Sequence, residues 1–229
     1  SACGFKESSV TQVKDWCREW GIALLAAKID CGALALLHGM EAWGMRIVDC
    51  ELTWVAGSER PLSEPVCGVD LELVQNSEVD GIGELGRTFA LDRFHGDYRI
   101  GDRGAERLWA ESLRNASAGR ADQVVVAHDG DAVAGAVTCF VQHYAAQYLD
   151  QPVCDLVHVA VAPAWQGKGL ATAMLAHALA WADAVTELVQ VGTQARNYAA
   201  NALYGKSGFR LAASQYSVHG YWPVCARGE

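Results

Sequence analysis

The chain has 229 residues, of which 51% are hydrophobic and 20% charged, and its formal net charge is -9 at pH 7. This apolar fraction is enough for a buried core and excludes a disordered chain. No run of about 18 apolar residues is free of charged or polar breaks, so we expect no membrane-spanning helix and no membrane partner. The acidic balance argues against general binding to nucleic acid, which needs a surplus of Lys and Arg.

Cysteine usage indicates a reducing compartment. The cysteines form no CxxC pair and do not stand at zinc spacing with His, so we expect free thiols and no metal. Free thiols are typical of cytoplasmic proteins, and the first residues, Ser1-Ala2-Cys3, show no secretory signal. Whether that N-terminus is native is left open. The eight cysteines occupy positions 3, 17, 31, 50, 67, 139, 154 and 225.

The first part of the chain alternates helix and strand patterns and then reaches a linker. Two Pro and two Gly within residues 56–68 are typical of a linker. We therefore predict an N-terminal α/β half-domain with linker over residues 1–68, followed by a larger domain over 69–229. The elements expected in the half-domain are a helix at 8–20, a strand at 22–29, a helix at about 32–43 and a strand at 46–54.

The larger domain mixes strands and helices. Asp129-Gly130-Asp131 between two apolar runs predicts a β-hairpin. The expected strands are 69–75, 123–128, 132–143, 153–162, 187–193 and 209–219, and the expected helices are 78–91, 104–117, 169–183 and 197–207.

A strand followed by a Gly-rich turn and a helix predicts an anion site. Residues 157–162 form the strand, Pro163 follows, and Gly167 and Gly169 precede the helix. The N–H groups of a first helical turn have no helical partner and carry partial positive charge, so they can hold a diphosphate. Lys168 adds a positive charge. The stretch fits neither GxxxxGK[ST] nor GxGxxG.

Two motifs in this part of the chain resemble those of the GNAT acetyltransferases. Gln166, Gly169 and Ala171 match Q/R-x-x-G-x-G/A, the pyrophosphate loop of that family. Residues 197–209 match its second signature, N-x-x-A-x-x-x-Y-x-x-x-G-F. The resemblance implies an α/β (α+β) GNAT fold, in which helices flank a mixed, mostly antiparallel sheet. It also implies direct transfer of acetyl from acetyl-CoA to an amine, without a metal.

The resemblance carries roles over to individual residues. The strand would bind the pantetheine amides through its backbone and polarise the thioester. Tyr204 would act as the general acid that protonates the departing thiolate. The residues expected to bind acetyl-CoA are Val159, Ala160, Val161, Gln166, Gly167, Lys168, Gly169, Leu170, Ala171, Thr172 and Asn197.

The general base is less well defined. Some GNAT enzymes that modify protein N-termini carry a Glu where this chain has Gly192. The candidates here are His158 and Asp155, and a His accepts a proton near neutral pH. We take His158 as the catalytic candidate, while a chain of waters is the alternative.

Several segments resemble the dTDP-4-amino-4,6-dideoxygalactose (TDP-fucosamine) N-acetyltransferases. They are residues 26–30, Gly44 with the strand that ends at Trp54, and residues 89–94, 108–115, 191–194 and 207–208. The resemblance implies a nucleotide-linked amino sugar as acceptor. An acidic protein that binds a second diphosphate needs local positive charge, for which Arg93 and His95 are candidates.

Other functions are also compatible with the sequence. The chain could acetylate another small amine or a peptide N-terminus, or it could hold CoA without turnover. We also expect a homodimer, because the family and the Trp-rich surfaces favour one. Tyr216, Tyr221 and Trp222 could stack on a nucleotide base or join such a contact.

Overall fold

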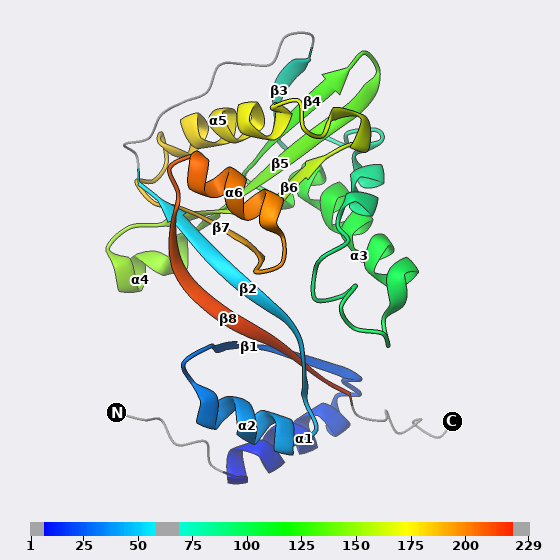
Figure 1. Cartoon of the computed structure of the whole chain (residues 1–229), viewed down its shortest axis with the longest axis vertical. Helices are drawn as coiled ribbons and strands as arrows, with labels where there is room; N and C mark the ends of the chain where they lie inside the picture. The colour runs from blue at the N-terminus through cyan, green and yellow to red at the C-terminus, as the bar shows by residue number, and fades with distance from the viewer. Residues whose placement is uncertain (1–6, 58–68, 222–229) are drawn as a thin grey trace. The chain divides into compact units, whose positions relative to one another are not determined.

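The computed structural model describes residues 7–57 and 69–221 of the chain (Figure 1). It divides into two compact units, one made of Ser1–Glu51 with Ala213–Glu229 and the other of Leu52–Ala212. The expected linker falls largely on residues 58–68, outside the described part. The domain boundary at 68/69 therefore stays a prediction, although the first unit is completed by the C-terminal strand.

The first unit pairs strands from opposite ends of the chain. Strand β1 (Leu24–Asp30) runs antiparallel to β8 (Arg210–Tyr221), from Leu24 opposite Tyr221 to Asp30 opposite Gln215. This pairing supplies the neighbour that a short α-β-α-β segment needs. The unit also holds α1 (Glu7–Glu19), α2 (Leu34–Ala42) and the first part of β2 (Arg46–Ala56), with Ile29, Leu37, Met45 and Val218 as its buried core.

The second unit holds the rest of a mixed, mostly antiparallel sheet, as predicted. Its neighbouring strands β3 to β6 pair antiparallel, whereas β6 and β7 pair parallel. The strand order of the whole sheet is β1-β8-β2-β7-β6-β5-β4-β3. The strands that lie wholly within this unit are β3 (Asp70–Val74), β4 (Gln123–Asp129), β5 (Ala132–Gln142), β6 (Val153–Val161) and β7 (Val189–Gln194).

Alternation along these strands separates two apolar cores. Val125 and Ala127 pack with α5 (Leu170–Ala182) on one face, where α6 (Tyr198–Lys206) also lies (Figure 1). Val124 and Val126 pack on the other face with the 3-10 helix η1 (Ile82–Thr88) and with α3 (Gly101–Asn115). The short remaining turns are η2 (Ala116–Arg120), η3 (His143–Ala145), α4 (Ala146–Leu149) and η4 (Pro163–Trp165).

The helix predicted at 78–91 is wrong in length and type, because only Ile82–Thr88 are helical and they form a 3-10 helix. Its glycines explain the difference. Gly81 has φ +82°, and a Cβ on Gly86 would lie 2.6 Å from the backbone nitrogen of Ala110 in α3. Glycine at these positions lets the backbone of the segment pack directly against the backbone of α3, which a regular helix with larger side chains would not allow.

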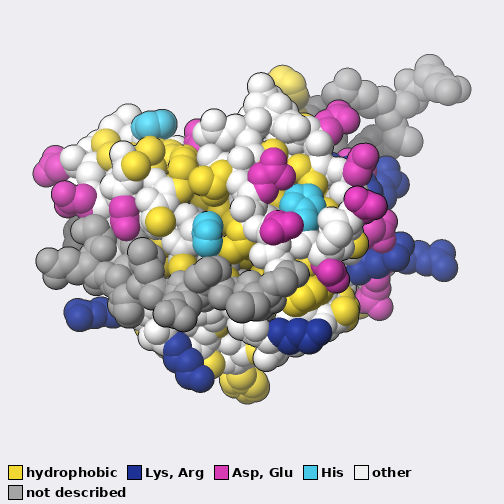
Figure 2. Space-filling model, turned by 90° about the horizontal axis from the view of Figure 1, so that it is seen from above, with side chains coloured by type: hydrophobic (Ala, Val, Ile, Leu, Met, Phe, Trp, Pro, Cys, Tyr) yellow, Lys and Arg dark blue, Asp and Glu magenta, His cyan; other side chains and the backbone are white. Residues whose placement is uncertain are grey.

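The surface agrees with the acidic composition. Figure 2 shows Asp and Glu side chains spread over one face, with Lys and Arg mainly at its rim. Among the described helices, each is too short or too polar to cross a bilayer. The five cysteines of the described part, Cys17, Cys31, Cys50, Cys139 and Cys154, are free thiols.

Candidate active site

The centre of the site is a separation between two parallel strands. Strands β6 and β7 pair only from Cys154 opposite Val189 to Leu156 opposite Val191. Both strands then continue, β6 to Val161 and β7 to Gln194, without further pairing to each other in the described structure. The edge of β6 that faces β7 is therefore open over its last residues, and an extended ligand can bind there as an added strand.

Backbone N–H and C=O groups of β6 point toward this open edge. Residue 157 is an extra residue, since Thr138 pairs with His158 while Cys139 pairs with Leu156. The nitrogen of Ala162 donates to the oxygen of Ala134 at 2.8 Å, so Ala160 and Ala162 direct their backbone groups toward β5. By alternation, Val159 and Val161 direct theirs toward the open edge.

The turn before α5 carries the residues for which an anion site was predicted. Gly167 and Gly169 have φ +73° and +83°, in the left-handed region, and nothing lies within 4 Å of a Cβ built on Gly167. Nε2 of Gln166 donates to the oxygen of Val161 at 3.1 Å, which ties the turn to the open strand. Lys168 lies over the Trp165 ring at 4.7 Å. Leu170 buries its side chain, so it offers a ligand only its backbone.

Helix α6 begins with a capped turn beside β7. The side-chain oxygen of Asn197 accepts from the nitrogen of Ala200 at 3.2 Å, and its amide donates to Thr193 at 3.2 Å. Asn201, which the sequence did not single out, donates to the oxygen of Asn197 and accepts from the Trp54 indole, both at 2.9 Å. A cofactor contact of Asn197 remains a prediction.

Tyr204 lies in the core formed beneath α6. Its side chain is buried, and its ring packs against Phe209 with centroids 5.8 Å apart. Burial raises the pKa of its phenol, because the charged form would lose its hydration. Tyr204 therefore keeps its proton at neutral pH and can act as a donor.

His158 is less accessible than a direct proton acceptor would be. The residue is only 1% exposed, its Nδ1 lies 2.7 Å from the hydroxyl of Thr138, and its Nε2 lies 3.0 Å from that of Ser112. Phe89 and Trp109 pack around its ring. Burial lowers its pKa from 6.5 to about 4, so the ring is neutral.

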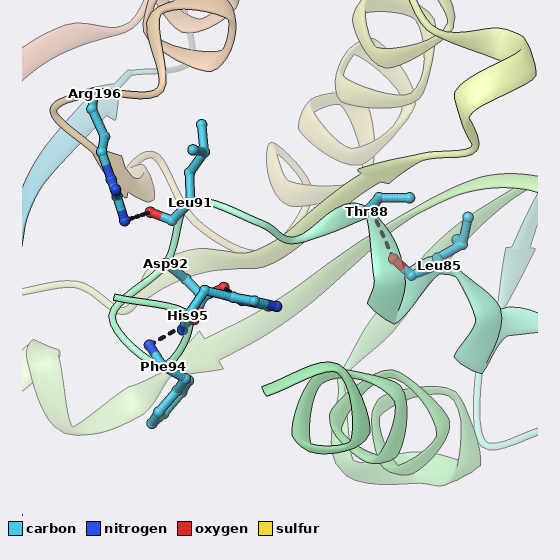
Figure 3. A network of polar contacts seen from close by, with 7 residues as sticks. All are labelled: Leu85, Thr88, Leu91, Asp92, Phe94, His95 and Arg196. Atoms are coloured by element: carbon cyan, nitrogen blue, oxygen red, sulfur yellow. Dashed lines mark hydrogen bonds and ion pairs between the residues drawn. The ribbon is translucent and has the colours of Figure 1, made fainter. Parts of the chain in front are cut away.

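The loop between η1 and α3 carries both predicted acceptor-binding residues. Arg93 lies over the Phe94 ring at 4.6 Å, and its Nε is buried without a hydrogen-bond partner in the described structure. His95 instead contacts Asp92, with Nδ1 and Oδ2 2.5 Å apart (Figure 3). Asp92 was missed in the sequence, since an isolated Asp in a turn-rich segment gives no signal of its partner.

Two other features lie away from these residues. A cavity of about 570 Å³ is lined by Leu149–Pro152 and Asp183–Glu187, at the start of β6 and β7, and contains no predicted site residue. Within the described residues, no group of three or more His, Cys, Asp or Glu side chains could hold a metal.

A mixed sheet whose parallel strands part beside a Gly-rich turn is the architecture of acetyltransferases that use acetyl-CoA. A family model described as "Acetyltransferase (GNAT) family" matches residues 89–209, more than half of the chain. The chain therefore belongs to the GNAT family of acetyltransferases, which confirms the predicted fold and resemblance.

The chain is also similar to a named protein over part of that protein's length. The chain is 30% identical over 149 residues to the "Spore coat polysaccharide biosynthesis protein SpsD" of Bacillus subtilis (strain 168), an alignment covering 64% of this chain and 48% of that protein. The chain thus matches about half the length of that relative.

Solved structures share the fold. A functionally unknown conserved protein from Staphylococcus epidermidis has a TM-score of 0.65 at 16% identity, covering 93% of this chain and 79% of its own. A GCN5-related N-acetyltransferase from Kribbella flavida has a TM-score of 0.60 at 14% identity, covering 94% and 76%.

Proposed function

We propose that the chain transfers the acetyl group of acetyl-CoA to the amine of a nucleotide-linked 4-amino-4,6-dideoxyhexose. The observation that carries the donor half is the open edge of β6 next to the left-handed turn before α5. A pantetheine arm needs paired backbone groups along an extended path, and a diphosphate needs unpartnered N–H groups at one end of that path.

The donor would lie along these groups in order. The N–H groups of residues 167–172 would hold the diphosphate, with Lys168 adding charge. Val159 and Val161 would bond the pantetheine amides and polarise the thioester oxygen, while Ala160 packs beneath them. Asn197 would contact the donor from the start of α6.

The reaction needs a proton donor and a proton acceptor. The amine nitrogen attacks the thioester carbon, a C–N bond forms and the C–S bond breaks. Tyr204 gives its phenolic proton to the departing thiolate, and a base takes one proton from the amine nitrogen. His158, proposed as that base from the sequence, would have to receive the proton through the Ser112 hydroxyl, because its ring is only 1% exposed.

The acceptor half rests on three features. The unpartnered Nε of Arg93 would bond a phosphate oxygen of the acceptor, with His95 in the same loop. The relative SpsD is named for polysaccharide biosynthesis, which agrees with a sugar acceptor. Some GNAT enzymes that modify protein N-termini have a Glu as the base at the position of Gly192, and Gly192 has no carboxylate to take that role. The homodimer and the cytoplasmic location stay predictions.

Mass spectrometry of the products tests this function. The protein is incubated with acetyl-CoA and dTDP- or UDP-linked 4-amino-dideoxyhexoses, peptides with free N-termini, or polyamines. Mass detection avoids the background that the cysteine thiols would give with thiol reagents. An acetyl gain on a nucleotide sugar, lost in Tyr204→Phe, is the expected result. A gain on peptides or polyamines alone would refute the sugar acceptor, and no gain on any amine would favour a CoA-binding module.

A further inference from the structure

We infer that His95, oriented by Asp92, is the general base that takes the proton from the acceptor amine. This inference rests on the proposed acetyl transfer and specifies the part of it that the sequence left open. It gives His95 a catalytic role in place of diphosphate binding, and leaves Arg93 as the phosphate ligand.

The loop that carries His95 bridges the two strands that separate. Phe89, at its start, lies with its ring centroid 6.0 Å from that of His158 on β6. Two residues later, the oxygen of Leu91 accepts from Arg196, which lies two residues after the end of β7, at 3.4 Å (Figure 3). The loop therefore passes from β6 to β7 at the end where their pairing has ceased.

The loop also lies on the side from which an acceptor must approach. Phe89 and Phe94 both pack against Trp109 of α3, with centroids 4.9 and 5.8 Å apart, so the loop belongs to the η1 and α3 face. The turn before α5 belongs to the opposite face of the sheet. A donor anchored at that turn presents its thioester through the open edge of β6, and the amine meets it from the face where His95 lies.

Asp92 and His95 form a fixed pair. Oδ1 of Asp92 accepts from the backbone nitrogens of Phe94 at 2.8 Å and His95 at 3.3 Å, which accounts for the turn of the loop. The turn does not require the second carboxylate oxygen, yet Oδ2 lies 2.5 Å from Nδ1 of His95. Since the side chain of Asp92 is only 5% exposed, its carboxylate is held in this orientation.

This pairing determines which nitrogen of His95 can react. A carboxylate at Nδ1 keeps the proton on that nitrogen and leaves Nε2 with its lone pair. Nε2 has no hydrogen-bond partner among the described residues, and Figure 3 shows this outer nitrogen pointing away from the loop backbone. Both ring nitrogens of His158, by contrast, already contact hydroxyl groups.

The neutral amine attacks the thioester carbon, the C–N bond forms and the C–S bond breaks. The N–H proton of the amine moves to Nε2 of His95, the carboxylate of Asp92 stabilises the imidazolium, and the departing thiolate takes the phenolic proton of Tyr204. Water then takes the proton from His95 and returns one to the phenolate of Tyr204, so both residues regain their starting states.

Substitutions at His95 separate this role from a structural one. The amide of Asn can still donate to Asp92 but cannot accept a proton, so His95→Asn should keep the fold and the affinity for acetyl-CoA. We expect kcat to fall by about 10²-fold or more, with the acceptor KM changed by less than about threefold. In His95→Ala, added imidazole should restore part of the lost rate. The matched control is His128→Asn, because His128 also faces a carboxylate, with Nε2 3.4 Å from Glu72, but lies on β4; its kcat should equal that of the wild type.

The acceptor in this test is whichever amine the wild type acetylates. A kcat of His95→Asn within about threefold of the wild-type value would overturn the inference, as would an imidazole-insensitive His95→Ala whose circular dichroism and acetyl-CoA affinity are native. Loss of turnover on a peptide acceptor would refute the sugar assignment and support His95 as base. No turnover by the wild type on any amine would overturn both.

Discussion

The buried imidazole of His158 makes a measurable prediction about stability at low pH. Burial lowers its pKa from 6.5 to about 4, so between these values the unfolded chain binds a proton that the folded protein does not. Stability is therefore fully present above the unfolded value and is lost as the pH falls toward the folded value. Each pH unit in this window removes about 1.4 kcal/mol, and the whole window removes about 3 kcal/mol.

The variant His158→Gln isolates this effect, because glutamine does not titrate while the other groups titrate in both proteins. At neutral pH we expect the variant to be less stable by about 1–3 kcal/mol, since it loses ring packing and a contact with Thr138 or Ser112. Between about pH 7.5 and pH 5, the difference in unfolding free energy between wild type and variant should shrink by about 2 kcal/mol.

Urea unfolding followed by fluorescence of the chain's eight tryptophans, among them Trp109 beside the His158 ring, measures this difference. The unfolding free energies come from linear extrapolation at each pH. A difference that stays constant within about 0.5 kcal/mol across this range would refute the reasoning, because His158 would then be as easily protonated in the folded protein as in the unfolded chain.

Three further predictions concern single positions. Tyr204→Phe should lower kcat by about 10²-fold and leave the calorimetric affinity for acetyl-CoA unchanged; an unchanged kcat would remove Tyr204 from the acid role. In Gly167→Ala the Cβ has room, so the substitution should destabilise the fold by only about 1 kcal/mol, through the positive φ of residue 167. It should nevertheless weaken acetyl-CoA binding, because the diphosphate approaches the backbone there. An affinity equal to that of the wild type would place the diphosphate elsewhere. Gly86→Ala brings a Cβ to 2.6 Å from Ala110, and a thermal melt should show a loss of more than about 2 kcal/mol; a wild-type melting temperature would contradict this packing.

Most elements could be predicted from local sequence. Helix α5 and strand β6 follow from their apolar pattern, and the turn between them follows from Gly167 and Gly169, because glycine adopts left-handed φ at little cost. The prediction failed for residues 78–91, where a helical pattern of apolar residues was outweighed by glycines that pack against α3.

From the amino-acid sequence alone, the family could be recognised and the donor side of the candidate site could be predicted, because the strand, the Gly-rich turn and the helix that build it are contiguous and governed by local backbone physics. The proposed acceptor side depends on the tertiary structure. Asp92 selects a nitrogen of His95, and Ser112 and Thr138 enclose His158, through side-chain contacts that no pattern specifies. The separation of β6 from β7 belongs to this second group, because it depends on where the pairing of strands distant in the sequence ceases.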